Sequence, residues 1–240
     1  TTSDDRRRAL AKFANKSESQ RALDALIKLA RTEDGIPLRV SELDKNPYLL
    51  GINNGVINLR AGSLRTSTQS EYITKLAPVT FNPDETCPKW LKFLDQAMGG
   101  DKDMIEYLQR IAGYSLTGIT TEQQLFFLYG FGANGKSVFV NTIQDLLGDY
   151  AMQTPVSTLM TKNKGSVNND VARLRGARFV ATTETEEHSK FNESEVKLLT
   201  GGDMITARFL NKEFFEFRPE FKLWISGNHK PVPGDGHGIW

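Results

Sequence analysis

Apolar residues near the start of the chain repeat with the period of an α-helix. The segment Ser17-Glu18-Ser19-Gln20 has the spacing of a capping box, which marks the beginning of a helix. After it, Leu23, Leu26, Ile27 and Ala30 fall on one helical face. We therefore predict that the first thirty residues are largely helical.

From Asn46 to about Phe81 the pattern changes to short apolar runs. The runs Leu49–Ile52 and Val56–Arg60 flank Asn53-Asn54-Gly55, and Asn-Gly between apolar runs is a strong signal for a β-hairpin. We predict two more β-like segments, at residues 72–76 and 79–81.

The second half of the chain alternates between strand-like and helix-like segments. Helical periodicity extends from residue 90 to residue 111, with a break at Gly99-Gly100. Strand candidates then lie at residues 125–129, 178–183, 206–210, 214–217 and 222–226. Such alternation is typical of an α/β domain with a largely parallel sheet. We predict this domain over residues 120–240, preceded by a smaller mixed helical and β region over residues 1–119.

The composition narrows the class of protein. A 240-residue chain with 39% hydrophobic residues can bury a substantial core, and its net charge of +1 argues against a broad nucleic-acid-binding face. The single cysteine, Cys87, excludes an internal disulfide and a cysteine zinc site. No apolar run approaches the roughly 18 residues of a membrane span, and no signal peptide opens the chain. We expect a cytoplasmic protein with no membrane partner.

The clearest chemical motif is the segment Gly130-Phe-Gly-Ala-Asn-Gly-Lys-Ser137, which matches the phosphate-binding pattern G-x-x-x-x-G-K-[ST]. A buried-strand run, Leu125–Tyr129, precedes it, and a helical segment from Ser137 to Leu147 follows it. This strand, loop and helix context is the one that the motif requires. An ordinary glycine turn is the alternative, and the context disfavours it.

Each residue type in this loop has a physical reason to be there. Glycines let backbone N–H groups and a helix N-terminus face a phosphate closely. Lys136 would reach the β- and γ-phosphates of ATP, and the Ser137 hydroxyl would ligate Mg²⁺. The predicted nucleotide-binding residues are Gly130, Gly132, Ala133, Asn134, Gly135, Lys136, Ser137 and Val138.

Two acidic residues and one amide complete the predicted catalytic set. Glu184 and Glu186 follow a strand-like run, where one carboxylate can hold Mg²⁺ and another can orient the attacking water. We assign contact with Mg²⁺ and the attacking water to Glu184, and we assign Glu186 as the second carboxylate that assists it. A solvated acidic turn is the alternative for this segment. Asn228 follows the strand-like run 222–226 and would touch the γ-phosphate or the lytic water, unless it is only a turn residue.

Two further stretches carry a family resemblance. Residues 192–208 (NESEVKLLTGGDMITAR) are similar to the K-x-L-T-G-G-D-x-I-x-A-R segment of superfamily 3 helicases, specifically the phage and plasmid branch with the primase-linked poxvirus helicases. The residues at 46–60, 87–88 and 113–118 look like the region before the motor in these proteins. With the phosphate loop and Asn228, the resemblance covers residues 46–240.

The resemblance implies a P-loop AAA+-type motor core, a hexameric ring with ATP sites between subunits, and an upstream primase domain in many members. It also implies a β-hairpin that grips single-stranded DNA, here residues 208–217 with its tip near Asn211-Lys212. Lys212 would meet a phosphate of the DNA, and Arg208 would assist it or face the nucleotide. An exposed hairpin lysine without function is the alternative, and we expect most of the hairpin's phenylalanines to be core residues.

The two ends of the chain complete the sequence-based expectations. It begins at Thr1 without an initiator Met and stops at Trp240, so we expect a fragment of a longer protein. Residues 231–240 resemble the approach to the family's arginine finger, which follows the Trp. We therefore expect this fragment to bind ATP but to hydrolyse it poorly.

The favoured function is an ATP- and Mg²⁺-dependent DNA helicase motor of a phage or mobile-element replication protein, which translocates on single-stranded DNA as a ring. A non-catalytic, nucleotide-dependent DNA-binding or loading platform is the main alternative. A small-molecule kinase would need a lid with catalytic arginines soon after the phosphate loop. The polar loop around Lys162 and Lys164 does not resemble one.

Overall fold

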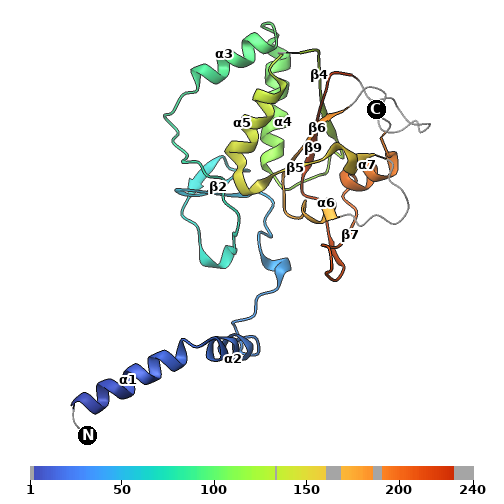
Figure 1. The fold of residues 1–240 in the computed structure, drawn as a ribbon. Helices are drawn as coiled ribbons and strands as arrows, with labels where there is room; N and C mark the ends of the chain where they lie inside the picture. Colours follow the sequence, from blue (N-terminus) through green and yellow to red (C-terminus); the bar gives the residue numbers. More distant parts are fainter. Residues whose placement is uncertain (1–2, 133, 161–168, 186–190, 230–240) are drawn as a thin grey trace. The chain divides into compact units, whose positions relative to one another are not determined.

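A computed structural model describes residues 3–132, 134–160, 169–185 and 191–229 (Figure 1). The chain forms two compact units, residues 1–43 and residues 44–240. Each unit is described below by itself.

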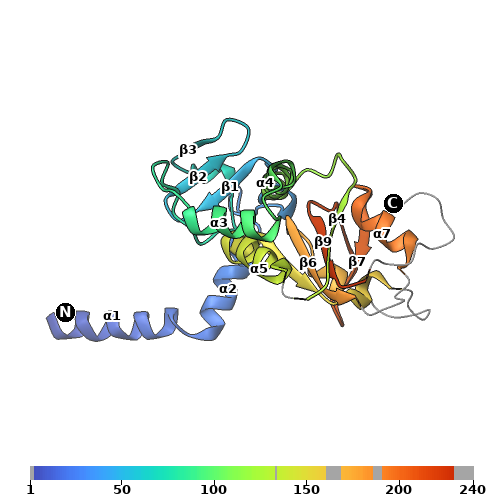
Figure 2. The same ribbon diagram turned by 90° about the horizontal axis from the view of Figure 1, so that it is seen from above.

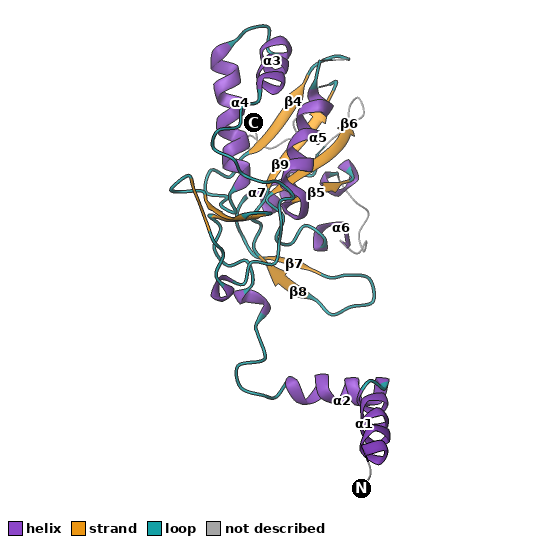
Figure 3. Cartoon of the chain, turned by 90° about the vertical axis from the view of Figure 1, so that its left-hand side faces the viewer, coloured by secondary structure: helices purple, strands orange, loops and turns teal. Residues whose placement is uncertain are grey.

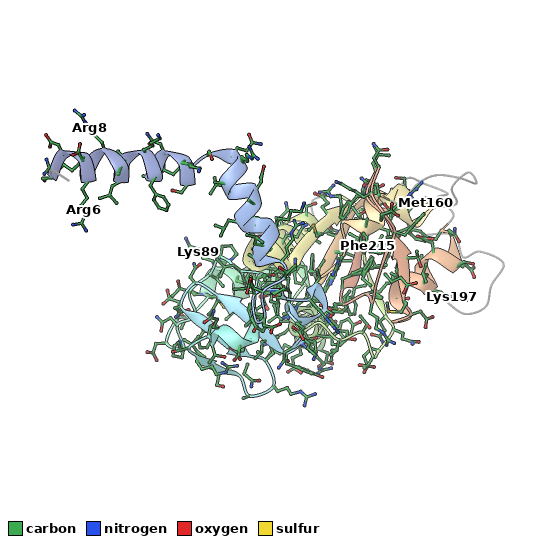
Figure 4. All side chains as sticks on the ribbon, turned by 90° about the horizontal axis from the view of Figure 1, so that it is seen from below. Arg6, Arg8, Lys89, Met160, Lys197 and Phe215 are labelled. Carbon is green, nitrogen blue, oxygen red and sulfur yellow. The ribbon has the colours of Figure 1, made fainter. Side chains whose placement is uncertain are left out.

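The first unit contains two α-helices, α1 (Ser3–Ser17) and α2 (Gln20–Ala30), and the short 3₁₀ helix η1 (Val40–Glu42). The predicted helices are confirmed, but the capping box is wrong by two positions. Ser17 ends α1, and its hydroxyl donates to the carbonyl oxygen of Phe13. Ser19 caps α2 by accepting from the Ala22 amide at 3.4 Å. Neither helix buries a residue in the described structure, and Arg6 and Arg8 point to different sides of α1 (Figure 4).

The second unit begins with a three-stranded antiparallel sheet made by β1 (Leu49–Ile52), β2 (Gly55–Asn58) and β3 (Ser63–Arg65). The hairpin predicted at Asn53-Asn54-Gly55 is confirmed, since Ile52 pairs with Gly55. Gly55 has φ +144°, and a Cβ there would lie 2.4 Å from the carbonyl oxygen of Arg65, so glycine is required.

The two strands predicted at residues 72–76 and 79–81 do not form. The segment follows the short helix η2 (Gln69–Glu71) and makes one isolated bridge, between Ile52 and Ala77. Its amides are taken by side chains instead: Thr74 donates to Asp44 at 2.8 Å, and Leu76 donates to Asp149 at 3.1 Å. These bonds replace the ladder that a strand would need.

Two helices lead to the second sheet, α3 (Pro88–Ala97) and α4 (Lys102–Leu116). The predicted break between them is confirmed, because Gly99 and Gly100 both have positive φ. The α4 helix begins after Asp101, whose carboxylate accepts from the Met104 amide at 3.0 Å.

The main sheet has four parallel strands in the order β4 (Leu125–Tyr129), β9 (Lys222–Gly227), β6 (Phe179–Thr185) and β5 (Ala151–Thr154). The prediction of an α/β fold with a parallel sheet is confirmed. Strand β5 was not predicted: its sequence, Ala-Met-Gln-Thr, lacks the β-branched and apolar run that marks a buried strand, and it lies at the edge of the sheet.

Helices cover both faces of this sheet, as Figure 2 shows. Helix α5 (Lys136–Leu147) packs on one face, where Trp224 contacts the rings of Phe126, Phe139 and Phe179. The opposite face is covered by α6 (Asn169–Ala172) and α7 (Glu193–Thr200). The remaining elements are η3 (Gly148–Tyr150), η4 (Val156–Leu159), β7 (Ile205–Ala207) and β8 (Phe215–Phe217).

The helices that precede the sheet share its core. Leu94 of α3 and Leu108 and Ile111 of α4 belong to the same buried cluster as Phe126 and Trp224. A boundary at residue 120 would therefore pass through one continuous hydrophobic core. The structure divides instead between Leu43 and Asp44.

The amino end of the sheet is fastened by two fully buried cations. Arg178, which precedes β6, donates at 2.8 Å to the carbonyl oxygens of both Leu49 and Leu116. Lys222, the first residue of β9, donates to the carbonyl oxygens of Thr117 and Ile119. These bonds connect the antiparallel sheet and the end of α4 to the parallel sheet.

Candidate functional site

The phosphate loop lies between β4 and α5, at the carboxyl end of the parallel sheet. Strand β4 ends at Tyr129 and α5 begins at Lys136, so the predicted strand, loop and helix context is confirmed. Helix α5 ends before Gly148, as predicted from the sequence. The predicted loop residue Ala133 lies outside the described residues.

Two glycines of the loop occupy positions where any larger residue would be strained. A Cβ on Gly130, which has φ +151°, would lie 2.0 Å from the side-chain nitrogen of Asn134. A Cβ on Gly135, which has φ +84°, would lie 2.9 Å from the ring of Phe93 in α3. The glycines therefore let the loop turn back on itself and let α3 approach it closely.

Lys136 is the centre of the hydrogen-bond network in the loop. Its Nζ donates to the carbonyl oxygen of Gly130 and, at 3.1 Å each, to the Oδ1 atoms of Asn134 and Asn228. The last of these bonds joins two residues that are 92 positions apart in the sequence. The structure therefore brings together Lys136 and Asn228, which the sequence motifs predict for one site.

The N-terminus of α5 faces the same space. Its N-cap residue, Gly135, has no side chain to cap the helix, so the first amides of the helix are available to an anion. Ser137 and Val138 in this first turn are exposed. A hydroxyl beside phosphate oxygens and water gives the all-oxygen coordination that Mg²⁺ prefers, so Ser137 fits the predicted metal role.

Strand register places the acidic segment at the same edge of the sheet. Gly227 of β9 pairs with Tyr129 of β4 on one side and with Thr185 of β6 on the other. The backbone of Glu184 therefore lies one residue from the level at which the phosphate loop begins. Glu186 lies outside the described residues.

A pocket of about 660 Å³ lies over the loop, within the size range of small-molecule sites. Seven predicted residues line it: Gly132, Asn134, Gly135, Lys136, Ser137, Val138 and Asn228. Three further lining residues, Phe93, Gln96 and Ala97, come from α3 and were not predicted. They lie about 35 positions before the motif, and their local pattern is that of an ordinary amphipathic helix. Figure 3 shows α3 and the start of α5 at the same end of the molecule.

The predicted hairpin is present at the opposite end of the sheet (Figure 1). Strands β7 and β8 pair through Ala207 and Phe215, and the connection between them contains Lys212. Asn211 has φ +59°, which confirms a turn at the predicted tip. Lys212 is exposed, and the Arg208 guanidinium lies 4.7 Å from the centre of the Phe214 ring.

The aromatic residues of the hairpin are less buried than expected. Phe217 is buried and Phe215 is half-buried, but Phe209 and Phe214 are 42% and 63% exposed. The expectation that most would be core residues is therefore wrong for these two. The strands end earlier than predicted, so the two phenylalanines lie in the loop and not over the core.

Neither metal ligation nor membrane insertion adds another site in the described structure. Among residues 3–132, 134–160, 169–185 and 191–229, no group of three or more His, Cys, Asp and Glu side chains could hold a metal ion. The helices of this part of the chain are also too short or too polar to cross a bilayer.

Two family models match the sequence. Residues 2–99 match a model described as D5 N terminal like, and residues 128–238 match a family of unknown function, DUF5906. The first match includes α3, and the second includes the phosphate loop after Leu128, together with Asn228.

Similar curated proteins come from viruses. One of Acanthamoeba polyphaga mimivirus, named putative helicase, is 31% identical over 210 residues, which is 85% of this chain and 22% of the relative. One of African swine fever virus, named putative primase, is 27% identical over 84% of this chain and 22% of its own length. The chain thus spans about a fifth of these relatives.

A solved structure supports the fold. The C-terminal region of NrS-1 in its apo form aligns with a TM-score of 0.52 and 12% identity, over 88% of this chain and 48% of that one. At this identity the similarity concerns the fold alone.

Proposed function

We propose that this chain, which belongs to the phage and viral primase-helicase family, is an ATP-hydrolysing motor that moves single-stranded DNA. The observation that carries the proposal is the convergence of Lys136, Asn228 and the uncapped N-terminus of α5 on one pocket. This pocket lies at the carboxyl end of a parallel sheet, where open α/β proteins bind their ligands. The motor core is of the P-loop AAA+ type.

The triphosphate of ATP would be held by the loop. The amides of the first turn of α5 face its negative charge, and Lys136 neutralises the β- and γ-phosphates. Ser137 and Glu184 would hold Mg²⁺, which draws charge from the transferring phosphoryl group when bound. Glu186 is the proposed partner for water activation.

The bond between Lys136 and Asn228 suggests how hydrolysis is sensed. An ammonium group has three donors, and the three contacts of Lys136 use all of them. A phosphate that binds Lys136 must therefore replace at least one of these acceptors. Release of Asn228 would free its amide to meet the γ-phosphate, and departure of that phosphate would restore the bond.

DNA binding is proposed for the hairpin. Lys212 can contact a phosphate, and the exposed ring of Phe214 beside Arg208 is suited to stack on a base. Arg175 lies 5.4 Å from the ring of Phe215 and extends the basic surface from the loop after α6. A ring of six subunits would line its channel with these hairpins.

The test is ATP hydrolysis by the full-length protein, with and without single-stranded DNA. Glu184→Gln should keep ATP affinity, because the loop is unchanged, and lower turnover by at least about 100-fold, the usual contribution of a positioned base or acid. Glu106→Gln, an exposed carboxylate on α4, is the matched control. ATP binding without DNA-stimulated hydrolysis in the full-length parent protein would favour the loading platform over the motor.

A further inference from the structure

Helix α3 forms one wall of the pocket over the phosphate loop. Phe93, Gln96 and Ala97 line this wall and lie about one helical turn apart. The Phe93 ring packs directly on Gly135, which explains why this position cannot carry a side chain. The wall is therefore in van der Waals contact with the phosphate loop.

A second cavity of about 320 Å³ adjoins the first along this wall. The two share Phe93, Ala97, Asn134, Gly135 and Lys136. The other residues of the second cavity are apolar or aromatic: Leu94, Met98, Met104, Leu108, Phe127, Leu128, Tyr129 and Phe139. The space beside the loop thus changes from polar at Lys136 to apolar beside α3. A nucleotide has the same polarity, with a charged triphosphate at one end and a flat, largely apolar base at the other.

We propose that α3 is the nucleoside subsite of the motor and that Gln96 selects adenine. This inference rests on the proposed function, since it assumes that the loop binds a nucleoside triphosphate. Phe93 and Ala97 offer the apolar surface for the base. Gln96 is exposed and lines the first cavity only, next to Phe93 and Ala97, which line both cavities. Its amide carries one donor group and one acceptor.

The chemistry of the amide points to adenine over guanine. The N6 and N7 edge of adenine presents a donor beside an acceptor, which a glutamine meets with two hydrogen bonds. The corresponding O6 and N7 edge of guanine presents two acceptors, so one of the two bonds cannot form. The site would therefore prefer ATP to GTP.

In this proposal, the two segments matched by family models contact different parts of the nucleotide. Helix α3 lies within residues 2–99, whereas the phosphate loop lies within residues 128–238. The first segment would recognise the nucleoside and the second would hold the phosphates. Neither segment alone would form a complete nucleotide site.

The experiment measures the affinities of the purified protein for Mg-ATP, Mg-GTP and Mg-tripolyphosphate by calorimetry and competition. Gln96→Ala should weaken ATP binding about tenfold, because one good bidentate pair is worth about that much. It should weaken GTP binding less, since guanine loses a single bond, and leave tripolyphosphate binding unchanged. Ala97→Leu should weaken both nucleotides by filling the pocket, again without an effect on tripolyphosphate. Leu91→Ala, on the exposed face of α3, is the control.

The outcomes separate the two proposals. One outcome is that Lys136→Ala binds none of the three ligands, while Gln96→Ala and Ala97→Leu keep the ATP and GTP affinities of the parent. This outcome would overturn the α3 subsite and keep the nucleotide site. Equal affinities of the parent protein for ATP and GTP would overturn adenine selection by Gln96. Unchanged binding of all three ligands in Lys136→Ala would instead overturn the proposed function. Thermal unfolding of each variant confirms that it is folded.

Discussion

The two ends of the parallel sheet each hold a lysine, in opposite surroundings. At the carboxyl end, Lys136 is half-buried and two of its three acceptors are side-chain amides, of Asn134 and Asn228. At the amino end, Lys222 is 1% exposed and donates only to backbone carbonyl oxygens. Side-chain acceptors can rotate away when a ligand arrives, whereas backbone carbonyls in a packed core cannot.

The two lysines therefore have different roles. Two of the three acceptors of Lys136 can rotate away, as its proposed role in phosphate binding requires. Lys222 is arranged to keep its acceptors, and its pKa is lowered from 10.5 to about 7, mainly by burial and also by the nearby Arg178 charge. The cost of burying this cation is offset by bonds that fasten α4 and the antiparallel sheet to the parallel sheet.

The largest expected effect is at the carboxyl end. Lys136→Ala should lower ATP turnover on the order of 10²- to 10³-fold, because it removes a preorganised cation from the charge that develops on the phosphates. Stability should change little, since the half-buried ammonium has no buried carboxylate partner among the described residues. Steady-state ATPase assays and urea unfolding measure the two effects, with the exposed Lys92→Ala as control. Turnover equal to that of the parent would show that the loop is not the site.

The opposite result is expected at the amino end. Lys222→Met keeps the aliphatic chain but leaves the carbonyl oxygens of Thr117 and Ile119 without their donor. An unsatisfied buried acceptor costs about 1–3 kcal/mol, so we expect the free energy of unfolding to fall by about 2 kcal/mol. ATP affinity of the folded protein should not change.

Urea unfolding, with Lys197→Met on the exposed surface of α7 as the matched control, measures this difference. Figure 4 shows Lys197 on the ribbon of the second unit. A decrease in stability of the same size in both variants would assign the effect to the methionine and not to the buried bonds.

Features that depend on contiguous residues could be predicted from the sequence alone. The strand, loop and helix around residues 130–137 were predictable because the glycines, Lys136 and Ser137 are contiguous and their signal is local. The hairpin at Asn53-Asn54-Gly55 was predictable for the same reason. The roles of Glu184 and Glu186 in catalysis stay predictions.

Long-range contacts could not be predicted in this way. Arg178 bonds to Leu49, 129 positions away, and nothing near either residue signals the pair. The wall of α3 is a second case, since Gln96 enters the site only through the packing of Phe93 on Gly135. In each case one partner is a backbone group or a glycine, so the side-chain pattern carries no trace of the interaction.

A smaller effect is expected for the hairpin, which is also separated from the phosphate loop by the length of the sheet. Lys212→Ala should weaken single-stranded DNA binding about tenfold and make its salt dependence shallower by about 0.7 for each DNA phosphate that the variant no longer binds. Basal ATP hydrolysis should persist, because Lys212 is not among the residues that line the pocket over the loop.

Fluorescence anisotropy over a range of salt concentrations, with ATPase assays in parallel, tests this separation. Lys197→Ala is the control for a general decrease in positive charge. Equal salt slopes in Lys212→Ala and the parent would place the DNA-binding residues outside the hairpin.

The last expected effect is the pH dependence that Lys222 gives to stability. In the unfolded chain its pKa is near 10.5, and in the folded protein burial holds the pKa at about 7. Between these values the unfolded chain binds more protons, so the free energy of unfolding rises with pH, by at most about 1.4 kcal/mol per unit. The gain is complete above pH 10.5, decreases as the pH falls, and is absent below about pH 7.

Other buried groups titrate outside most of this window or with the opposite sign. Burial raises the pKa of Glu220, so its own contribution decreases stability as the pH rises above its ordinary value of 4.5. Burial also raises the pKa of Tyr150 above 10, where ionisation of the unfolded chain decreases stability. The Lys222 effect is therefore isolated by subtracting the unfolding free energies of Lys222→Met from those of the parent, between about pH 7.5 and 9.5, inside the window that the two pKa values define. The difference should grow with pH; a constant difference would mean that Lys222 keeps an ordinary pKa in the folded protein and that the two lysines differ less than their surroundings suggest.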